Sequence, residues 1–443
     1  MSEYKKPNTA EAFEENFAQK KPLMNSTEAY FESSRCLTCY DAPCITACPT
    51  GIDIPLFIKQ IQTKNLTGSA RTIFESNWLG NACGKICPTG VLCEGACVYN
   101  HQDVPPIQIG RLQNYATSLA IENNKKLFTA GEDNGRKVAV IGSGPAGIAC
   151  ACELRTLGYS VDIYEAKTKP SGLTLHGIAA YKITNEEVTS ELDFLTSQLG
   201  LNFICNHGIE SKEQLSDLET NYDAIFLGVG IGPTRSLELP GEEKANVVGA
   251  VEFIEQLRDQ HEAMNVPENI VVIGGGNTAM DAASQSARLG AKKVTLAYRR
   301  DKGSMGAYGF EYKLAISAGV DSLFHAQPVA IVGEGEATGV EFVETESIDG
   351  KLHYKADSEF VVPADLVIKA TGQAKCLHLF ALVDQLELDS KNRIVVNDKF
   401  QCTNPQYFAG GDAVNGGAEV VNAAYEGKQA ALGIDAWLNT KQS

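Results

Sequence analysis

The 443-residue sequence has neither an excess of positive charge nor a long apolar run, and each absence excludes a class of protein. Its 38 lysine and arginine residues are outnumbered by 55 aspartate and glutamate residues, which gives a net charge of −17. A chain with this balance cannot neutralise phosphates in bulk, so we expect no nucleic-acid binding. No apolar run has membrane-spanning length, and residues 1–21 lack the apolar centre of a signal peptide. We therefore expect a cytoplasmic protein that does not bind membranes.

The sequence also lacks the pattern of a structural zinc site, although it contains 13 cysteines. Eight of them fall between Cys36 and Cys97, in runs spaced C-x2-C-x4-C-x3-C-P and C-x3-C-P-x4-C-x3-C. Zinc sites commonly use two C-x2-C pairs or added histidines, whereas only one such pair occurs here and His101 is not at ligand spacing. Runs that end in Cys-Pro are typical of iron–sulfur proteins. The pattern favours two four-iron clusters over zinc or inert thiols.

The residues around these cysteines show few strand signals. We expect residues 1–125 to form a helical domain, in which residues 54–74 make one amphipathic helix with Phe57, Ile58 and Ile61 on the buried side. Residues 123–136 are polar, contain two glycines and are expected to form a linker.

A glycine-rich turn follows the linker. Residues 137–165 read KVAVIGSGPAGIACACELRTLGYSVDIYE, a strand, a turn, a helix and a second strand. This layout lets backbone N–H groups approach a pyrophosphate at the helix N-terminus. Glu165 ends the second strand, where a carboxylate can bind ribose hydroxyls. The turn residues expected to contact a dinucleotide have G-x-G-x-x-G spacing and are Gly142, Ser143, Gly144, Pro145, Ala146 and Gly147.

Residues 269–300 repeat the pattern without the terminal acid. A strand at 270–273 leads into a glycine turn and a helix from about Asn277, and a second strand runs from Lys293 to Tyr298. A later strand within 364–372 ends in the small residues A-T-G, which commonly close such domains. The residues expected to contact the second dinucleotide are Gly274, Gly275, Gly276, Asn277, Thr278, Thr371 and Gly372, together with the arginine pair described next.

Arg299 and Arg300 occupy the place of the missing acid. Cations at this point favour the 2′-phosphate of NADPH over NADH. Asp301 follows at once and would oppose a phosphate, and a solvated arginine pair at a strand end is the alternative interpretation. The expected nicotinamide cofactor is therefore NAD(P)H.

Three segments of the cysteine region resemble a known module. CLTCYDAPCITACPTGIDIPLFI, LGNACGKICPTGVLCEGACVYN and IGRLQNYA are similar to the N-terminal module of dihydropyrimidine dehydrogenases and to the small subunit of bacterial glutamate synthase. The resemblance implies that Cys83 is not a ligand and that Gln113 is one, although Gln113 by itself could be a polar helix residue. The implied ligands are Cys36, Cys39, Cys44 and Cys97 for one 4Fe-4S cluster, and Cys48, Cys87, Cys93 and Gln113 for the other.

Two later segments resemble the flavin-binding parts of the same family. PSGLTLHGIAAYKIT is similar to a loop that runs beside the flavin, with Ser171 and Ala179 in place of a family glycine and proline. The segment around GGDAVNGG is similar to a second flavin signature, in which the aspartate bonds the ribityl chain and the next helix points its N-terminus at the flavin. The implied FAD contacts are Gly172, Leu173, Lys182, Gly411, Asp412 and Val420, of which Lys182 could equally be a surface lysine.

The expected fold is α/β, with an N-terminal α-helical iron–sulfur domain and two Rossmann-like dinucleotide-binding domains, the second inserted in the first. The expected ranges are 1–125 for the cluster domain, 126–237 with 373–443 for the FAD domain, and 238–372 for the NAD(P)H domain. NAD(P)H delivers two electrons as a hydride, FAD can release them singly, and each cluster carries one. We identify no proton-relay pair or nucleophile, so no catalytic residue is predicted.

These ranges leave no segment for a pyrimidine site. Full-length dihydropyrimidine dehydrogenases carry an additional FMN barrel, so the resemblance implies a flavin/iron–sulfur subunit that serves a separate FMN-containing, dihydroorotate-dehydrogenase-like catalytic subunit. The alternatives are a glutamate synthase small subunit, a related reductase with another acceptor, and an interaction scaffold that has lost electron transfer.

Overall fold

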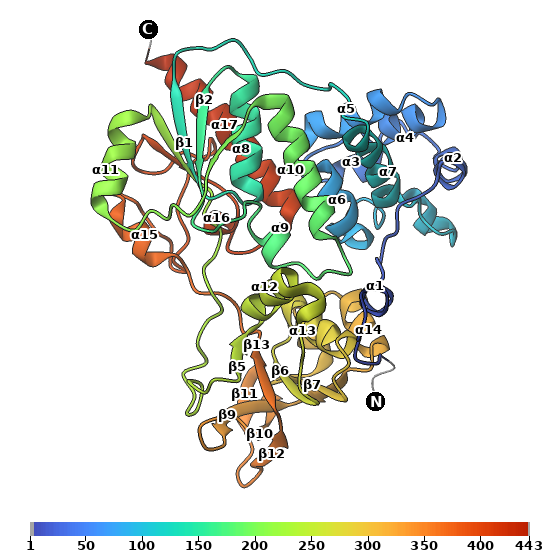
Figure 1. The fold of residues 1–443 in the computed structure, drawn as a ribbon, viewed down its shortest axis with the longest axis vertical. Helices are drawn as coiled ribbons and strands as arrows, with labels where there is room; N and C mark the ends of the chain where they lie inside the picture. The colour runs from blue at the N-terminus through green and yellow to red at the C-terminus, as the bar shows by residue number, and fades with distance from the viewer. Residues whose placement is uncertain (1–3, 442–443) are drawn as a thin grey trace. The chain divides into compact units, whose positions relative to one another are not determined.

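The computed structural model describes residues 4–441, which form two compact units (Figure 1). Unit 1 comprises the residues up to Gln19, His176–Tyr181 and Gly232–Ala374. Unit 2 comprises Lys20–Leu175, Lys182–Ile231 and the residues from Lys375 onward. No helix within residues 4–441 is both long and apolar enough to span a membrane.

The sheet of unit 2 has five parallel strands in the order β14-β4-β1-β2-β3. Val138 and Val140 of β1 pack against helices α8 and α17, whereas Ala139 and Ile141 face α11 and α15. This alternation is the period of two that a strand covered on both faces requires. The bounds are β1 (Lys137–Ile141), β2 (Ser160–Tyr164), β3 (Asn202–Ile204), β4 (Ala224–Leu227), β14 (Tyr407–Ala409), α8 (Pro145–Thr156), α11 (Lys212–Asn221), α15 (Leu377–Leu382) and α17 (Val420–Thr440).

The cysteine-bearing part of unit 2 is helical, as predicted, and has its own apolar core around Ile54, Phe57 and Leu112. The prediction of one helix over 54–74 was wrong. The chain turns at Lys64, which has a φ of 62°, and the Asn65 side chain then caps a new helix by accepting from the Gly68 N–H at 3.0 Å. The helices are α2 (Ser26–Ser34), α3 (Pro43–Thr46), α4 (Ile54–Gln62), α5 (Leu66–Ser76), α6 (Gly80–Ile86), α7 (Ile109–Glu122), and the 3-10 turns η1 (Thr89–Val91) and η2 (Val98–Gln102).

Three further helices lie wholly or mostly in unit 2. They are α9 (Leu173–His176), α10 (Asn185–Leu199) and α16 (Asp412–Asn415). The linker expected at 123–136 contains no helix or strand in the structure.

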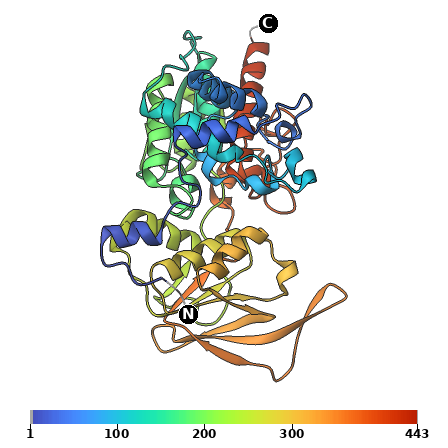
Figure 2. The same cartoon turned by 90° about the vertical axis from the view of Figure 1, so that its right-hand side faces the viewer.

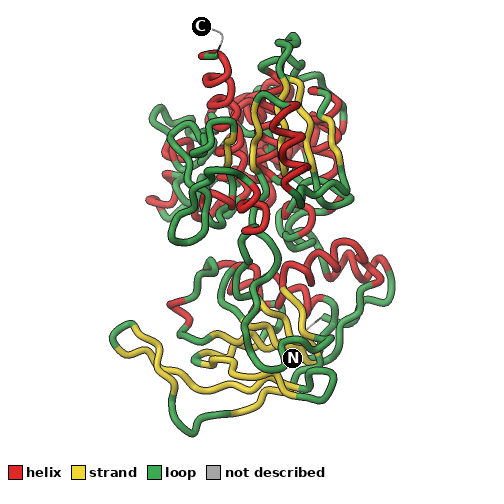
Figure 3. Tube along the Cα trace, turned by 90° about the vertical axis from the view of Figure 1, so that its left-hand side faces the viewer, coloured by secondary structure: helices red, strands yellow, loops and turns green. Residues whose placement is uncertain are grey.

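Unit 1 has a second parallel sheet, in the order β5-β13-β6-β7-β8. Helices cover one face of it, and the antiparallel sheet β11-β10-β12, with β9 beside β10, covers the other. Figures 2 and 3 show the strands of this antiparallel sheet beside the parallel one. The strands are β5 (Val247–Gly249), β6 (Asn269–Ile273), β7 (Lys293–Tyr298), β8 (Asp321–Phe324), β9 (Ala326–Val332), β10 (Gly339–Ile348), β11 (Lys351–Tyr354), β12 (Phe360–Pro363) and β13 (Leu366–Lys369).

The helices of unit 1 include one from the start of the chain. They are α1 (Ala10–Asn16), α12 (Ala250–Gln260), α13 (Asn277–Arg288) and α14 (Gly309–Ser317), with 3-10 turns η3 (His261–Ala263) and η4 (Lys302–Ser304). Phe13 and Phe17 stack with their ring centroids 4.4 Å apart inside the core of unit 1. The α/β class with a helical cysteine domain is therefore confirmed. The predicted domain ranges remain predictions, and the compact units divide the chain differently at residues 19 and 176–181.

Candidate cofactor sites

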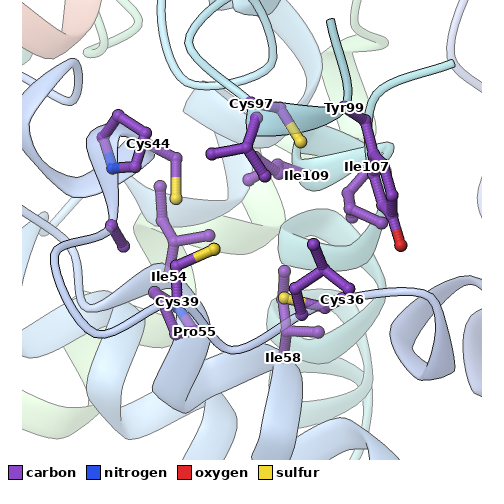
Figure 4. A pocket seen from close by; sticks show the side chains of 14 residues that line it. Cys36, Cys39, Cys44, Ile54, Pro55, Ile58, Cys97, Tyr99, Ile107 and Ile109 are labelled. Carbon is purple, nitrogen blue, oxygen red and sulfur yellow. The ribbon is translucent and has the colours of Figure 1, made fainter. Parts of the chain in front are cut away.

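Four cysteines converge on one pocket of unit 2. Cys36 and Cys39 follow α2, Cys44 lies on α3 and Cys97 precedes η2. Figure 4 shows their sulfur atoms pointing into a shared space, and apolar side chains such as Ile54 close its wall. Burial raises the pKa of the Cys36 thiol and raises that of Cys44 to about 11. Four sulfur donors with apolar walls suit an iron–sulfur cluster, whose positive iron would hold these groups as thiolates.

The second predicted cysteine set also comes together. Burial raises the pKa of the Cys93 thiol, and the nearby Glu94, Cys87 and Cys48 raise it further. The pKa of Cys87 is raised by its hydrogen bond with Cys83 and by burial, while Lys21 opposes the rise. Cys93 thus lies within electrostatic reach of both Cys48 and Cys87, and Cys83 lies beside Cys87.

Gln113 is the fourth predicted member of the second set. It is buried on α7, and its Nε2 donates to the Gly80 carbonyl at 2.6 Å, at the start of the helix that ends before Cys87. Since Nε2 is occupied, the amide oxygen is the side-chain atom left to bind a metal. Within residues 4–441, no three His, Cys, Asp or Glu side chains converge closely enough for a single metal ion. The donor chemistry of the two sets, seven thiols and one amide, instead fits two iron–sulfur clusters, which are larger than a single ion.

A buried polar network holds the helices of the second set. Glu191 of α10 accepts from the Asn81 N–H at 2.6 Å and the Ala82 N–H at 3.1 Å. Burial raises the pKa of this carboxyl to about 8. The buried Lys85 pairs with Glu187 at 2.7 Å. These contacts fasten α6 to α10, and no local sequence pattern indicated them.

Asn81 extends the network to the next helix. Its Oδ1 accepts from the side chains of Asn114, Thr117 and Ser118 on α7, at 2.8, 2.8 and 3.0 Å. The helices that carry or adjoin Cys87 and Gln113 are therefore joined by their own polar side chains.

The first glycine turn has the close contacts that its spacing requires. Gly142 has a φ of 99°, and a Cβ there would lie 2.5 Å from the Gly228 carbonyl oxygen. A Cβ on Gly147 would overlap the Gly142 carbonyl, so α8 can lie against β1 only with glycine there. At Gly144 the nearest atom to an added Cβ is 4.0 Å away. The turn is therefore tightly packed at Gly142 and Gly147 and open at Gly144, an arrangement that suits the binding of phosphates.

Glu165 is tied to this turn. One carboxylate oxygen accepts from the Ser143 N–H at 3.1 Å and from its hydroxyl at 2.5 Å, and the other accepts from the Lys167 N–H at 2.8 Å. Each carboxylate oxygen can accept more than one hydrogen bond, so Glu165 retains acceptor capacity for a ribose hydroxyl.

The later flavin segments lie against the same turn. An added Cβ on Gly172 would lie 2.8 Å from Gly144 Cα, and one on Gly411 would lie 3.0 Å from Ala146 Cβ. Gly172 lies in the loop before α9, and Leu173 begins that helix. Gly411 comes shortly after the end of β14.

Asp412 follows Gly411 at the start of α16. It accepts from the Ala418 N–H at 3.1 Å, and burial raises its pKa while Lys375 opposes the rise. Val420 begins α17, as predicted, and Glu419 caps that helix. Lys182 is partly buried and returns the chain to unit 2.

The second glycine turn lies in unit 1. An added Cβ on Gly274 would overlap the Ala370 carbonyl, and the Ala370 N–H donates to the Ile273 carbonyl at 2.8 Å, so the A-T-G segment lies against the turn. The Thr371 hydroxyl is buried and has no hydrogen-bond partner among residues 4–441. Gly276 has no atom within 4 Å of an added Cβ. An open turn beside an unpaired buried hydroxyl fits a bound dinucleotide.

The remaining residues of this turn are placed around it. The Tyr298 ring lies against Gly275, and the Asn277 side chain accepts from the Tyr308 N–H at 3.0 Å. Thr278 lies in the first turn of α13, and Gly372 has a φ of 92°.

Arg299 and Arg300 follow β7, exposed and half-buried respectively. The structure records no partner for either guanidinium within residues 4–441. Asp301 accepts from the Ser304 hydroxyl at 3.1 Å and its N–H at 3.0 Å, which lower the pKa of that carboxyl. The arginines are thus available to an anion, and the acid between them and η4 is bound within its own turn.

Two family models match the chain. Residues 13–125 match "dihydropyrimidine dehydrogenase domain II, 4Fe-4S cluster", and residues 136–427 match "pyridine nucleotide-disulphide oxidoreductase". Among curated proteins, the glutamate synthase [NADPH] small chain of Escherichia coli is 36% identical over 434 residues, 93% of this chain and 92% of that protein. The NAD-dependent dihydropyrimidine dehydrogenase subunit PreT of Escherichia coli is 34% identical over 417 residues, 94% of this chain and 96% of that protein.

Solved structures support the fold of the later part. FprA from Mycobacterium tuberculosis in complex with NADPH has a TM-score of 0.57 at 17% identity, covering 69% of this chain and 85% of that one. Thioredoxin reductase from T. acidophilum has a TM-score of 0.54 at 19% identity, covering 69% of this chain and 99% of that one. At these identities the likeness concerns the fold alone.

Proposed function

Because the chain belongs to the pyridine nucleotide-disulphide oxidoreductase family and carries the 4Fe-4S domain of dihydropyrimidine dehydrogenases, we propose that it is the electron-delivering subunit of a two-subunit dihydropyrimidine dehydrogenase. The chain is an NAD(P)H-dependent oxidoreductase with FAD and 4Fe-4S clusters. Its proposed role is to pass electrons from NAD(P)H through FAD and two clusters to a partner subunit that reduces uracil or thymine. The proposed partner is the FMN-containing, dihydroorotate-dehydrogenase-like subunit.

The observation that carries this proposal is the joint presence of the two cysteine sets and the flavin segments in unit 2. The I-G-x-L-Q context of Gln113 favours the dihydropyrimidine dehydrogenase assignment, since it resembles that family's segment. The match over 94% of this chain to a protein named as a subunit of such an enzyme gives further support. Among residues 4–441 none of the 13 cysteines forms a disulfide, which agrees with our proposal of a cytoplasmic, reducing location.

The first cysteine set is the proposed exit for electrons. Leu37, which lines its pocket, is 53% exposed, and Tyr40, between Cys39 and Cys44, is 99% exposed. A partner protein that covers these side chains would come close to this set.

The test uses anaerobically purified chain with and without the FMN-containing subunit. We expect the chain alone to oxidise NAD(P)H with artificial dyes but not to reduce uracil, and we expect uracil-dependent NAD(P)H oxidation when the subunit is added. Cys36→Ala should remove one cluster and abolish the uracil-dependent rate while FAD is retained. Cys402→Ala, at a buried cysteine outside both sets, is the matched control and should keep the rate.

A second candidate is the small subunit of glutamate synthase, favoured by the 36% identity over 93% of the chain. Glutamate formation only with a glutamate synthase large subunit would support this candidate. Uracil reduction by the chain alone would contradict the division of labour proposed for both.

A further inference from the structure

Lys21 places its ammonium group at the second cysteine set. Nζ donates to the Cys87 carbonyl at 3.0 Å and to Thr89 Oγ1 at 3.3 Å. A Cβ added to Gly110 would lie 3.3 Å from the same Nζ, so the ammonium also lies against the first turn of α7. Lys21 therefore lies where the segment of Cys87 meets the helix that carries Gln113.

The structure gives Lys21 no acidic partner within residues 4–441, although the chain as a whole carries a net charge of −17. The side chain is half-buried and bonds only to neutral oxygens. Burying an ammonium without a counter-charge costs free energy, so this placement indicates negative charge nearby. A bound cluster would add such charge beside Nζ, because it would keep the cysteines of the second set as thiolates, and the carboxylates described next contribute as well.

The other charges around this set are acidic or already paired. Glu94 lies beside Cys93 and accepts from the Gly110 N–H at 3.0 Å. Glu419, at the start of α17, contributes to raising the pKa of Cys87. Lys85 is buried but pairs with Glu187 at 2.7 Å. Among the described residues, Lys21 is the cation that this site holds without an ion pair.

The first cysteine set differs in this respect. Arg35, next to Cys36, pairs with Glu32 at 2.7 Å and donates to the Pro105 carbonyl at 2.5 Å. The charge of Arg35 is therefore already compensated by Glu32.

We propose that Lys21 raises the reduction potential of the cluster held by Cys48, Cys87, Cys93 and Gln113, in addition to the effect of the neutral glutamine ligand. The inference rests on the proposed ligand set. Reduction adds one electron and no proton, and Lys21 stays protonated throughout. Its attraction to the added negative charge favours the reduced form, since net charge and hydrogen bonding set cluster potentials.

The test is a potentiometric titration followed by EPR on anaerobic, cluster-loaded protein. Gln113→Cys identifies which signal belongs to the second set. Lys21→Gln keeps an amide donor near the Cys87 carbonyl but removes the charge. We expect about a tenfold smaller equilibrium constant for reduction of that cluster, which is about 59 mV for one electron, and no change at the first cluster.

Two variants separate charge from structure. Lys21→Arg keeps the charge and should restore the wild-type potential. Lys59→Gln removes an equal charge from the exposed face of α4 and should change neither potential. An unchanged potential in Lys21→Gln overturns the proposal. Loss of the second cluster from that variant overturns it as well, because Lys21 would then hold the site together rather than set its potential. Wild-type protein with only one cluster would instead refute the ligand set.

Discussion

Arg299 and Arg300 are placed to distinguish the two nicotinamide cofactors. They follow β7 directly, and the structure records no partner for either guanidinium within residues 4–441. Both carboxylate oxygens of Asp301 accept hydrogen bonds from Ser304, so this side chain is held in its own turn and does not pair with the arginines. The arrangement therefore favours a bound phosphate more than the sequence order Arg-Arg-Asp suggests.

Replacing both arginines with glutamine should weaken NADPH far more than NADH. Each lost charge-assisted contact to a 2′-phosphate is expected to cost about 1–3 kcal/mol, and NADH has no such group. The ratio of kcat/KM for the two cofactors in a dye assay measures this. The double variant Lys59→Gln/Arg71→Gln, at exposed positions of α4 and α5, also removes two charges and is the charge-matched control. Equal losses for NADPH and NADH in the double variant would show that the pair does not bind the phosphate.

Single residues differ in how far their sequence context reveals them. The spacing of the first glycine turn predicts the close packing of Gly147, because its contact with the Gly142 carbonyl lies within one short segment. Lys21 was missed, since its contact with Cys87 joins residues 66 positions apart. No pattern within a short window encodes such a contact.

At the scale of elements, helices α6 and α10 are joined through one buried carboxyl. Glu191 receives two backbone N–H groups from the start of α6, and burial raises its pKa to about 8 from an ordinary value of 4.5. Between these two values the folded protein retains a proton that the unfolded chain has released. The free energy of unfolding must therefore fall as pH rises through this window.

The expected slope is about 1.4 kcal/mol per pH unit at most, from this group alone. Denaturant unfolding between pH 5 and 9 should show it as a difference between the wild type and Glu191→Gln, in which the titrating group is gone. Glu186→Gln, on the exposed side of the same helix, should follow the wild type. Identical pH profiles for wild type and Glu191→Gln would mean that Glu191 is ionised in the folded protein throughout.

Elements with strong periodicity were predicted well. The strand expected at Lys293–Tyr298 is β7 with the same bounds. The helix near Val420 was implied by the family resemblance rather than by periodicity, and α17 begins there. The helix expected over 54–74 is two helices, because the left-handed turn at Lys64 and the cap at Asn65 interrupt an apolar pattern that runs through both. Periodicity reports which side chains are buried, not whether the backbone continues unbroken.

At the scale of the whole molecule, the order of the chain and its grouping into units differ. Residues up to Gln19 and residues 176–181 group with unit 1, although the segments after them belong to unit 2. Asn16 donates to the Arg288 carbonyl at 2.7 Å, and the Arg288 guanidinium lies over the rings of Tyr4 and Tyr181, 5.0 and 4.5 Å from their centroids. The predicted ranges placed both segments with their neighbours in the sequence, whereas these long-range contacts place them in unit 1.

This grouping predicts where a mutation near the N-terminus acts. Phe13 is 1% exposed, stacks on Phe17 and lies in the core of unit 1 with residues of α12 and α13. Phe13→Ala should destabilise unit 1 by about 3–5 kcal/mol, the usual cost of emptying a phenylalanine site.

Phe31→Ala is the matched control for this prediction, since Phe31 lies on α2 of unit 2 and is 66% exposed. Thermal unfolding and NAD(P)H affinity should both change in Phe13→Ala and stay near wild type in Phe31→Ala. Iron content should remain that of the wild type in both, because the cysteines lie in unit 2. If Phe13→Ala lost iron while keeping its NAD(P)H affinity and stability, α1 would belong with the cluster helices, as the predicted range 1–125 has it. If Phe13→Ala keeps its iron and binds NAD(P)H more weakly, helix α1 supports the nucleotide-binding unit.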